Sequence, residues 1–331
     1  MNKRISLAHG DGGELAHQLI QNVFVEAFGH SEEAKSDAAI FQSPGIRLAL
    51  TTDSFVIKPL FFPGGSIGKL AVAGTVNDLA VSMAKPLYLT SSFIIEEGFL
   101  LEDLKKIVFD MAKEAKKAGV KIVAGDTKVV ERGSADGLFI NTTGVGVVEE
   151  RERIPFTEGD AVIVSGPIGD HGIAVLAARG ELGLRSEVES DCACLNEPIQ
   201  AVLEKVEGVK IMRDPTRGGL ATTLVEICES EKIEIELEEE HIPVRAEVHG
   251  ACDLLGFDPL YLANEGKVVL VVSAENKDAV LEILKSYSET KDAVVIGKVS
   301  ATGGGRLLLK TPLGSHRILQ RLSGMQLPRI C

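Results

Sequence analysis

Short stretches of alternating apolar and polar residues, and longer stretches with apolar residues at helical spacing, organise the first part of the chain. From Ile46 to Leu50 every second residue is apolar, which predicts a half-buried strand that runs into Asp53. From Glu102 to Ala118 the apolar residues recur every three or four positions, which predicts an amphipathic helix with Gly119 beyond its end as the C-cap. Further strands are predicted at 120–124 and 138–148. This mixture predicts an α/β or α+β domain.

A charged stretch, residues 151–160, separates this region from a second patterned one. It contains Pro155 and Gly159, and breakers among charges are typical of a linker. Beyond it, strands are predicted at 161–165, 233–237, 267–273 and 294–299, and helices after Gly169 and at 219–229 and 277–286. We therefore expect an N-terminal domain at 1–150 and a C-terminal α/β domain at 151–310.

The last segment, residues 311–331, differs from both regions, and we call it the tail. Prolines and glycines interrupt it, and it contains arginines but neither Asp nor Glu. These features predict a mobile basic segment on an acidic body. Because about 20 extended residues reach roughly 60 Å, we expect the terminal Cys331 to visit both an internal site and an outside partner.

Charge and composition argue against binding to nucleic acid or to a membrane. The formal net charge of −13 disfavours nucleic acid, because binding to phosphates depends on clustered Lys and Arg. No apolar run approaches the roughly 18 residues of a membrane span. An odd number of thinly spread cysteines fits a reducing compartment rather than a disulfide framework. We expect a cytoplasmic protein that binds neither nucleic acid nor membrane.

Four aspartates lie among small and turn-forming residues, and two of them directly follow predicted strands. They are Asp53, Asp78, Asp126 and Asp214. A turn or a helix cap explains any one of them alone. Together at strand ends, several carboxylates would repel one another unless a hard cation such as Mg²⁺ joined them. Spacing alone leaves both interpretations open.

Two glycine-rich segments, 10–13 and 64–69, have the composition of loops whose backbone amides approach phosphate. Neither is a P-loop, because the second is one residue too short and Leu70 stands where Ser or Thr would bind Mg²⁺. If the protein uses ATP, we expect an acidic, metal-bridged site instead.

The cysteines and histidines form no metal-binding motif. Cys192 and Cys194 lack the second ligand pair that structural zinc requires. Two others lie in apolar contexts that predict core positions: Cys228 and Cys252. Cys331 differs because it bears both a thiol and the terminal carboxylate, although composition alone allows it to be accidental. Among the histidines, only His9 and His171, beside glycines, stand out.

Several motifs along essentially the whole chain resemble the HypE family of hydrogenase maturation factors. They are SLAHGDGGE at 6–14, TTD at 51–53, the segment 64–86, GDTKV at 125–129, DPTRGGL at 214–220, ANEGK at 263–267 and PRIC at 328–331. The PRIC ending is the most specific, since aminoimidazole ribonucleotide synthetase, thiamine-monophosphate kinase and selenophosphate synthetase are similar only in the glycine–aspartate segments. Selenophosphate synthetase also carries a reactive cysteine or selenocysteine near its N-terminus, and this chain has no cysteine before Cys192.

The resemblance implies a two-domain fold like that of aminoimidazole ribonucleotide synthetase, with ATP in the cleft and a homodimer paired through the N-terminal sheets. It also implies a reaction. A carbamoyltransferase, HypF, loads a carbamoyl group onto Cys331. The protein then dehydrates this group with ATP to a thiocyanate, which supplies cyanide, through a HypC–HypD complex, to the iron of nickel–iron hydrogenase.

The resemblance further implies roles for individual positions. Those implied to bind the cofactor are Asp11, Gly12, Gly13, Asp53, Asp78, Asp126, Thr127, Asp214 and Thr216. Those implied to bind Mg²⁺ are Asp53, Asp78, Asp126 and Asp214. The implied catalytic residues are Cys331, which carries the group, Lys128, near the phosphates, and Glu265, the base. As a base, Glu265 needs burial and a raised pKa.

Two other functions fit parts of the sequence. A non-enzymatic thiol carrier or metallochaperone would use Cys331, with Cys192 and Cys194, to bind metal without ATP turnover. A small-molecule kinase or synthetase would keep the fold and treat the tail as incidental. Deletion of residues 328–331 separates these classes, because a small-molecule enzyme should survive the loss.

Overall fold

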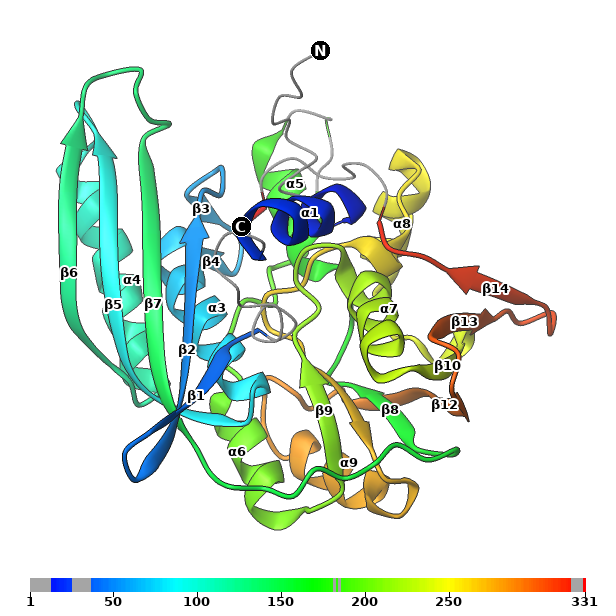
Figure 1. Ribbon diagram of the computed structural model, residues 1–331. Helices are drawn as coiled ribbons and strands as arrows, with labels where there is room; N and C mark the ends of the chain where they lie inside the picture. The colour runs from blue at the N-terminus through cyan, green and yellow to red at the C-terminus, as the bar shows by residue number, and fades with distance from the viewer. Residues whose placement is uncertain (1–12, 26–36, 181–182, 184–185, 323–329) are drawn as a thin grey trace.

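Two β-sheets, one in each half of the chain, organise the computed structural model (Figure 1). The structure describes residues 13–25, 37–180, 183, 186–322 and 330–331. None of the helices within these ranges combines the length and the apolar character that crossing a bilayer requires.

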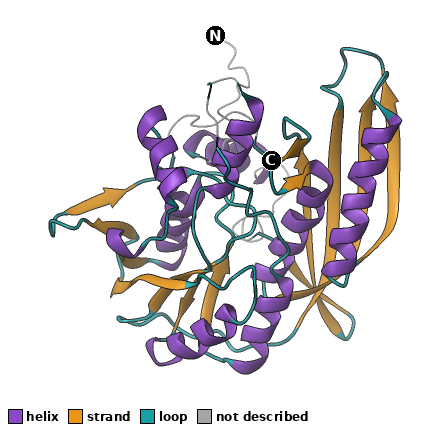
Figure 2. Cartoon of the chain, turned by 180° about the vertical axis from the view of Figure 1, so that it is seen from behind, coloured by secondary structure: helices purple, strands orange, loops and turns teal. Residues whose placement is uncertain are grey.

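The first sheet has the strand order β1-β2-β7-β5-β6. Its strands are β1 (Ala39–Ser43), β2 (Ile46–Phe55), β5 (Ala84–Glu96), β6 (Lys121–Val130) and β7 (Leu138–Val148). Helices α3 (Ile67–Val81) and α4 (Leu101–Lys117) pack on one face of it (Figure 2). The predicted helix and strands are confirmed here, although β6 is longer and carries the GDTKV motif within the strand.

The apolar stripe of β2 faces the opposite way from the one we expected. Ile46 and Leu50 are 47% and 39% exposed on the open face of the sheet, whereas Ala49 is buried under the helices. Leu50 pairs in register with Val145, which pairs with Tyr88, so an apolar row crosses this open face. The prediction of a strand was right, but burial of this stripe within one subunit was wrong.

The second sheet has the order β14-β13-β10-β12-β8-β11-β9. Its strands are β8 (Ala161–Val164), β9 (Val209–Arg213), β10 (Ile233–Glu238), β11 (Val269–Val272), β12 (Val294–Thr302), β13 (Arg306–Lys310) and β14 (His316–Leu319). Its helices are α5 (Asp170–Arg179), α6 (Asn196–Lys205), α7 (Gly219–Glu231), α8 (Ala246–Leu255) and α9 (Lys277–Lys285). Shorter elements include α1 (Glu14–Leu19), a π-helix (Ile20–Val25) and the ribbon β3 (Phe61–Phe62) with β4 (Gly65–Ser66).

The first part of the tail belongs to this second sheet, which corrects the prediction of a mobile segment from residue 311. Strand β14 pairs antiparallel with β13, and Leu319 is buried. Acidic residues from other elements meet the arginines: Arg321 lies 2.5 Å from Glu229, and Arg317 lies 3.6 Å from Asp258. Residues 323–329 lie outside the described ranges, and the chain end at 330–331 packs where the two halves meet.

Helix α3 joins the two halves because it is buried on nearly every side. Towards α4 the backbones approach so closely that a Cβ on Gly68 would lie 2.2 Å from the carbonyl oxygen of Ile107. Towards the second domain, the amide of Asn77 donates to the carbonyl of Ala193 (3.0 Å) and accepts from the backbone of Leu195 (2.8 Å). Helix α3 therefore makes close contacts with both halves of the chain.

We predict that Gly68→Ala lowers the free energy of unfolding by about 1–3 kcal/mol, because the added methyl forces α3 away from α4. Urea unfolding measures the change. Gly250→Ala, within α8 and with open space around its Cβ, is the matched control and should gain up to about 1 kcal/mol. Equal stability of the two variants would contradict the close packing of α3.

Candidate functional site

Three of the four predicted aspartates come together between the two sheets. Asp53 is on β2, Asp78 is on α3, and Asp214 follows β9. The carboxyl groups of Asp53 and Asp78 are hydrogen-bonded, and Thr51 donates its hydroxyl to Asp78 (2.7 Å). Asp214 is buried, whereas the other two keep part of their surface exposed.

Burial raises the pKa values of these aspartates, and the charges of neighbouring carboxylates add to the shift at Asp78 and Asp214. Burial, and then the charges of Asp53 and Asp214, raise the pKa of Asp78 well above its ordinary value. Burial and the charge of Asp37 raise the pKa of Asp214 to about 8, against the opposing charge of Arg213. The cluster therefore has more negative groups than nearby cations can neutralise.

The chemistry of this cluster fits Mg²⁺, because hard cations prefer carboxylate oxygens. Across the described ranges, however, no three His, Cys, Asp or Glu side chains are arranged to hold a metal ion. Asp53 and Asp78 bond to each other where metal ligands would have to face the ion. The donor atoms are suitable, and rotation of these side chains would be needed to form the site.

Asp126, Thr127 and Lys128 are not part of this cluster within one chain. They lie on β6, the edge strand, and β7 and β5 separate it from β2. Lys128 donates to Asp126 at 2.9 Å, and both side chains are more than half exposed. The structure thus places the fourth predicted carboxylate apart from the other three.

The remaining predicted phosphate-binding residues have mixed positions. Asp11 and Gly12 lie outside the described residues. Gly13 is buried where a Cβ would lie 2.2 Å from the carbonyl oxygen of Leu322. Thr216 is in the turn between β9 and α7, where its carbonyl accepts from the backbone of Gly219 (3.0 Å). A Cβ on Gly219, which has φ +65°, would lie 2.6 Å from the carbonyl oxygen of Leu260, so this turn requires glycine.

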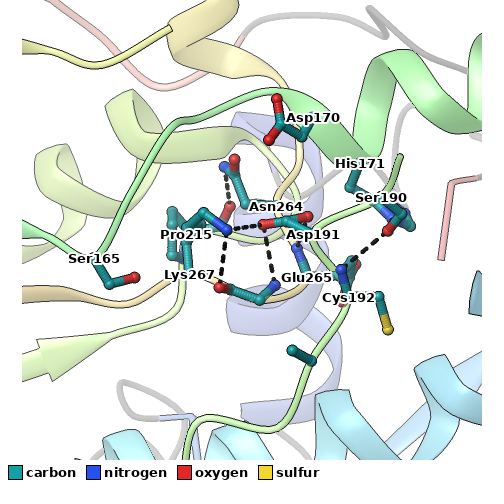
Figure 3. Close-up of polar contacts among 12 residues, drawn as sticks. Ser165, Asp170, His171, Ser190, Asp191, Cys192, Pro215, Asn264, Glu265 and Lys267 are labelled. Atoms are coloured by element: carbon teal, nitrogen blue, oxygen red, sulfur yellow. Dashed lines mark hydrogen bonds and ion pairs between the residues drawn. The ribbon is translucent and has the colours of Figure 1, made fainter. Parts of the chain in front are cut away.

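Glu265 lies in a loop whose polar contacts with Asp191 and Lys267 are seen in Figure 3. Asp191 accepts hydrogen bonds from the backbones of Glu265 (3.1 Å) and Gly266 (3.2 Å), and its charge is balanced by Lys267 at 3.2 Å. Burial, followed by the charges of Asp214, Asp191 and Asp53, raises the pKa of Glu265 well above its ordinary value. Its Oε1 is buried and finds no hydrogen-bond partner among the described residues. The two properties required of a base are present.

The chain end reaches the same place. The backbone of Val56, just after β2, donates to the terminal carboxylate of Cys331 at 3.2 Å. Burial, with smaller contributions from Glu265 and Asp53, raises the pKa of the Cys331 thiol to about 12, while Arg217 opposes the shift. The charges of Glu265 and Asp53 therefore reach Cys331, although nearly 280 positions separate Cys331 from Asp53.

Several residues of this region were missed by sequence reasoning. Arg217 lowers the pKa values of Asp53, Glu265 and Cys331, so its charge acts on all three. Arg217 lies in the DPTRGGL motif at 214–220, but the motif did not predict a role for this residue. Asp191 carried no signal, because its partners lie more than 70 positions away.

The Cys192 and Cys194 pair behaves as part of the core. Burial raises the pKa of both thiols well above the ordinary value. The backbone of Cys194 donates to Glu114 at 3.2 Å. Inert thiols of this kind disfavour a metal carrier built on the pair.

Comparisons with known proteins agree along the whole chain. The family described as AIR synthase related protein matches through its N-terminal domain at residues 35–148 and its C-terminal domain at residues 157–310. Carbamoyl dehydratase HypE of Cupriavidus necator is 49% identical, over 99% of this chain and 95% of its own. Carbamoyl dehydratase HypE of Escherichia coli is 47% identical, over 99% of each.

Solved structures of other proteins also resemble this chain over most of its length. A HypE–HypF complex gives a TM-score of 0.85 at 51% identity, over 92% of this chain and 99% of that one. The structure of a HypE in complex with ATP gives a TM-score of 0.82 at 42% identity, over 99% of this chain and 100% of that one. The structure of a ThiL complexed with AMPPCP and TMP gives a TM-score of 0.72 at 16% identity, over 93% of this chain and 96% of that one. A likeness at this identity shows a shared fold and no more.

We predict that Asp214→Asn makes the stability of the protein less dependent on pH. The carboxyl has a pKa of about 8 when folded and about 3.9 when unfolded, so between these values only the folded protein holds its proton. Wild-type stability should therefore fall as the pH rises through this window, and the variant should lose less. Urea unfolding at several pH values tests this. Exposed Asp253→Asn is the control, and identical pH profiles for Asp214→Asn and wild type would contradict the assignment.

Proposed function

This chain belongs to the HypE family of carbamoyl dehydratases, and on that premise we propose that it uses ATP to dehydrate a carbamoyl group carried by its own Cys331. The observation that carries the proposal is that Cys331 is packed against the core within reach of the charge of buried Glu265, so that burial and then this charge raise the pKa of the thiol. The reaction belongs to hydrogenase maturation in the cytoplasm, with thiocyanate as the product.

The chemistry proceeds in two steps. The carbamoyl oxygen is a poor leaving group, so it first attacks the γ-phosphorus of ATP, the bond to ADP breaks, and ADP departs. The nitrogen loses one proton as the oxygen is phosphorylated. The C–O bond to phosphate then breaks, phosphate leaves, and the nitrogen loses its second proton. The product is S–C≡N on Cys331, and the water removed from the carbamoyl group is accounted for by conversion of ATP to ADP and phosphate.

Glu265 is the base for the nitrogen proton. A carboxylate with a raised pKa accepts a proton more strongly than a solvated one, and unpartnered Oε1 is available to do so. Asp191 fixes the backbone on which Glu265 is carried. Arg217, whose charge acts on Cys331 and Glu265, would stabilise negative charge that develops on the phosphorylated group.

Asp53, Asp78 and Asp214 are the residues that would hold Mg²⁺, and the ion supplies neutralisation of the ATP phosphates when bound. A relative's structure in complex with ATP supports the nucleotide. Gly13 and Thr216, with Asp11 and Gly12, remain our candidates for nucleotide contacts. Asp126, Thr127 and Lys128 lie on the exposed edge of the sheet, so they would reach a site only in a second copy of the chain.

A homodimer paired through the first sheet would complete this arrangement. Its open face carries the row Leu50, Val145 and Tyr88, and β6 leaves an unpaired edge with Val123 58% and Val129 68% exposed. Such an edge promotes association unless it is covered. The solved structure of a related HypE–HypF complex supports HypF as the partner that donates the carbamoyl group. We propose a HypC–HypD complex as the acceptor of cyanide.

Carbamoylated protein incubated with ATP and magnesium should yield a C-terminal peptide lighter by one water, as measured by mass spectrometry. Glu265→Gln should keep the carbamoyl group without losing water, because the amide cannot take the proton. Cys331→Ala should show neither modification, and residues added after Cys331 should block the reaction. Water loss without ATP, or at another cysteine, would refute the mechanism.

Light scattering should give twice the chain mass of 35.3 kDa. Tyr88→Glu, which places a charge in the apolar row, should shift the protein to monomer. Phe109→Glu is the control, because Phe109 is 68% exposed on α4, on the helical side of the sheet. A wild-type monomer that remains active at micromolar concentration would rule out pairing through this face.

A further inference from the structure

His171 is fully buried beside the chain end, and nothing in the proposed chemistry uses it. Its Nε2 lies 2.6 Å from the carbonyl oxygen of Ile330, and its Nδ1 lies 2.8 Å from the hydroxyl of Ser190. Figure 3 labels His171 and Ser190. The ring of Phe62 meets the imidazole edge-on, with centroids 5.5 Å apart. His171 thus binds the second-last residue of the chain, and it is itself held by Ser190 and packed against Phe62.

The partners of the imidazole define where its proton lies. A carbonyl oxygen can only accept, so Nε2 must donate to Ile330. Ser190 already accepts from the backbone of Cys192 at 3.1 Å, which leaves its hydroxyl hydrogen for Nδ1. Burial lowers the pKa of His171, which favours the neutral ring with a single N–H. Ser190 therefore selects the form of His171 that binds the chain end.

Ile330 is also anchored through its side chain. It is 9% exposed and belongs to the apolar cluster that contains Phe62, Ile173 and Val188. Cys331, in contrast, is only partly buried, and among the described residues its terminal carboxylate accepts a hydrogen bond from the backbone of Val56. The second-last residue, rather than the reactive one, makes the more extensive contacts.

We propose that His171, oriented by Ser190, is a positioning residue that docks the chain end through the carbonyl of Ile330 and so presents Cys331 to Glu265. The docked state also shields the thiol from electrophiles in solution. Its docking role stands on the contacts alone, whereas its effect on turnover rests on the proposed dehydratase function. Loss of the bond should then expose the thiol and slow the reaction that needs it docked.

Alkylation of unmodified full-length protein by iodoacetamide tests the docking. The thiol sulfur bonds to the methylene carbon, iodide leaves, and the thiol proton passes to solvent. His171→Phe keeps a ring against Phe62 but removes the donor, and Cys331 should react about tenfold faster, since the Ile330 carbonyl loses its buried partner. His171→Gln retains an N–H at similar reach and should restore most of the protection.

Peptide mass spectrometry reads each cysteine separately, so unchanged protection of Cys192 shows that the fold is intact. Ile330→Ala provides a second route, because it loosens the anchor without altering the body of the protein. In carbamoylated His171→Phe, water loss in a single turnover should slow by a similar factor. Wild-type alkylation rates at Cys331 in both His171→Phe and Ile330→Ala would overturn the proposal. Faster alkylation with no water loss in wild type would support docking and refute the dehydratase function instead.

Discussion

The burial of helix α3 against both domains is the constraint on which the rest of the structure depends. Its backbone contacts α4 at Gly68, and Asn77 binds the segment 193–195 of the second domain. The next residue, Asp78, is thereby placed against Asp53. The segment that Asn77 holds continues back to Ser190, which orients His171. The acidic cluster and the binding of the chain end thus share one support.

The site holds acidic groups in places where burial disfavours their charged form. Asp78, Asp214 and Glu265 each have a pKa raised by burial and by neighbouring carboxylates, and selection for stability alone would disfavour such buried acidic groups. By contrast, the Asp191–Lys267 pair is satisfied by further backbone hydrogen bonds and fixes the loop that carries Glu265. The groups with raised pKa values thus include those that we propose to act on the nucleotide and on the carbamoyl group.

Sequence periodicity predicted α4 and most strands, because these elements have one apolar side. It did not predict α3, which is buried all round and therefore shows no helical period. Strand β14 was missed because Pro312 and Gly314 were interpreted as breakers of a tail, whereas they lie in the turn before it. The motifs identified Asp53, Asp78 and Asp214, but only strand order shows that Asp126 is three strands away. The contact of His171 with Ile330 spans 159 positions and left no local signal.

The contact between Gly266 and the backbone of residue 191 has a consequence for how such a site can evolve. A Cβ at position 266 would lie 1.8 Å from the carbonyl oxygen of Asp191, closer than any relaxation of a side chain could relieve. A lineage cannot replace this glycine first and adjust later, because the intermediate would displace Asp191 and Glu265 together. The two loops can change only in concert, so this part of the molecule is closed to single-step mutational paths even though neither residue contacts the reacting atoms.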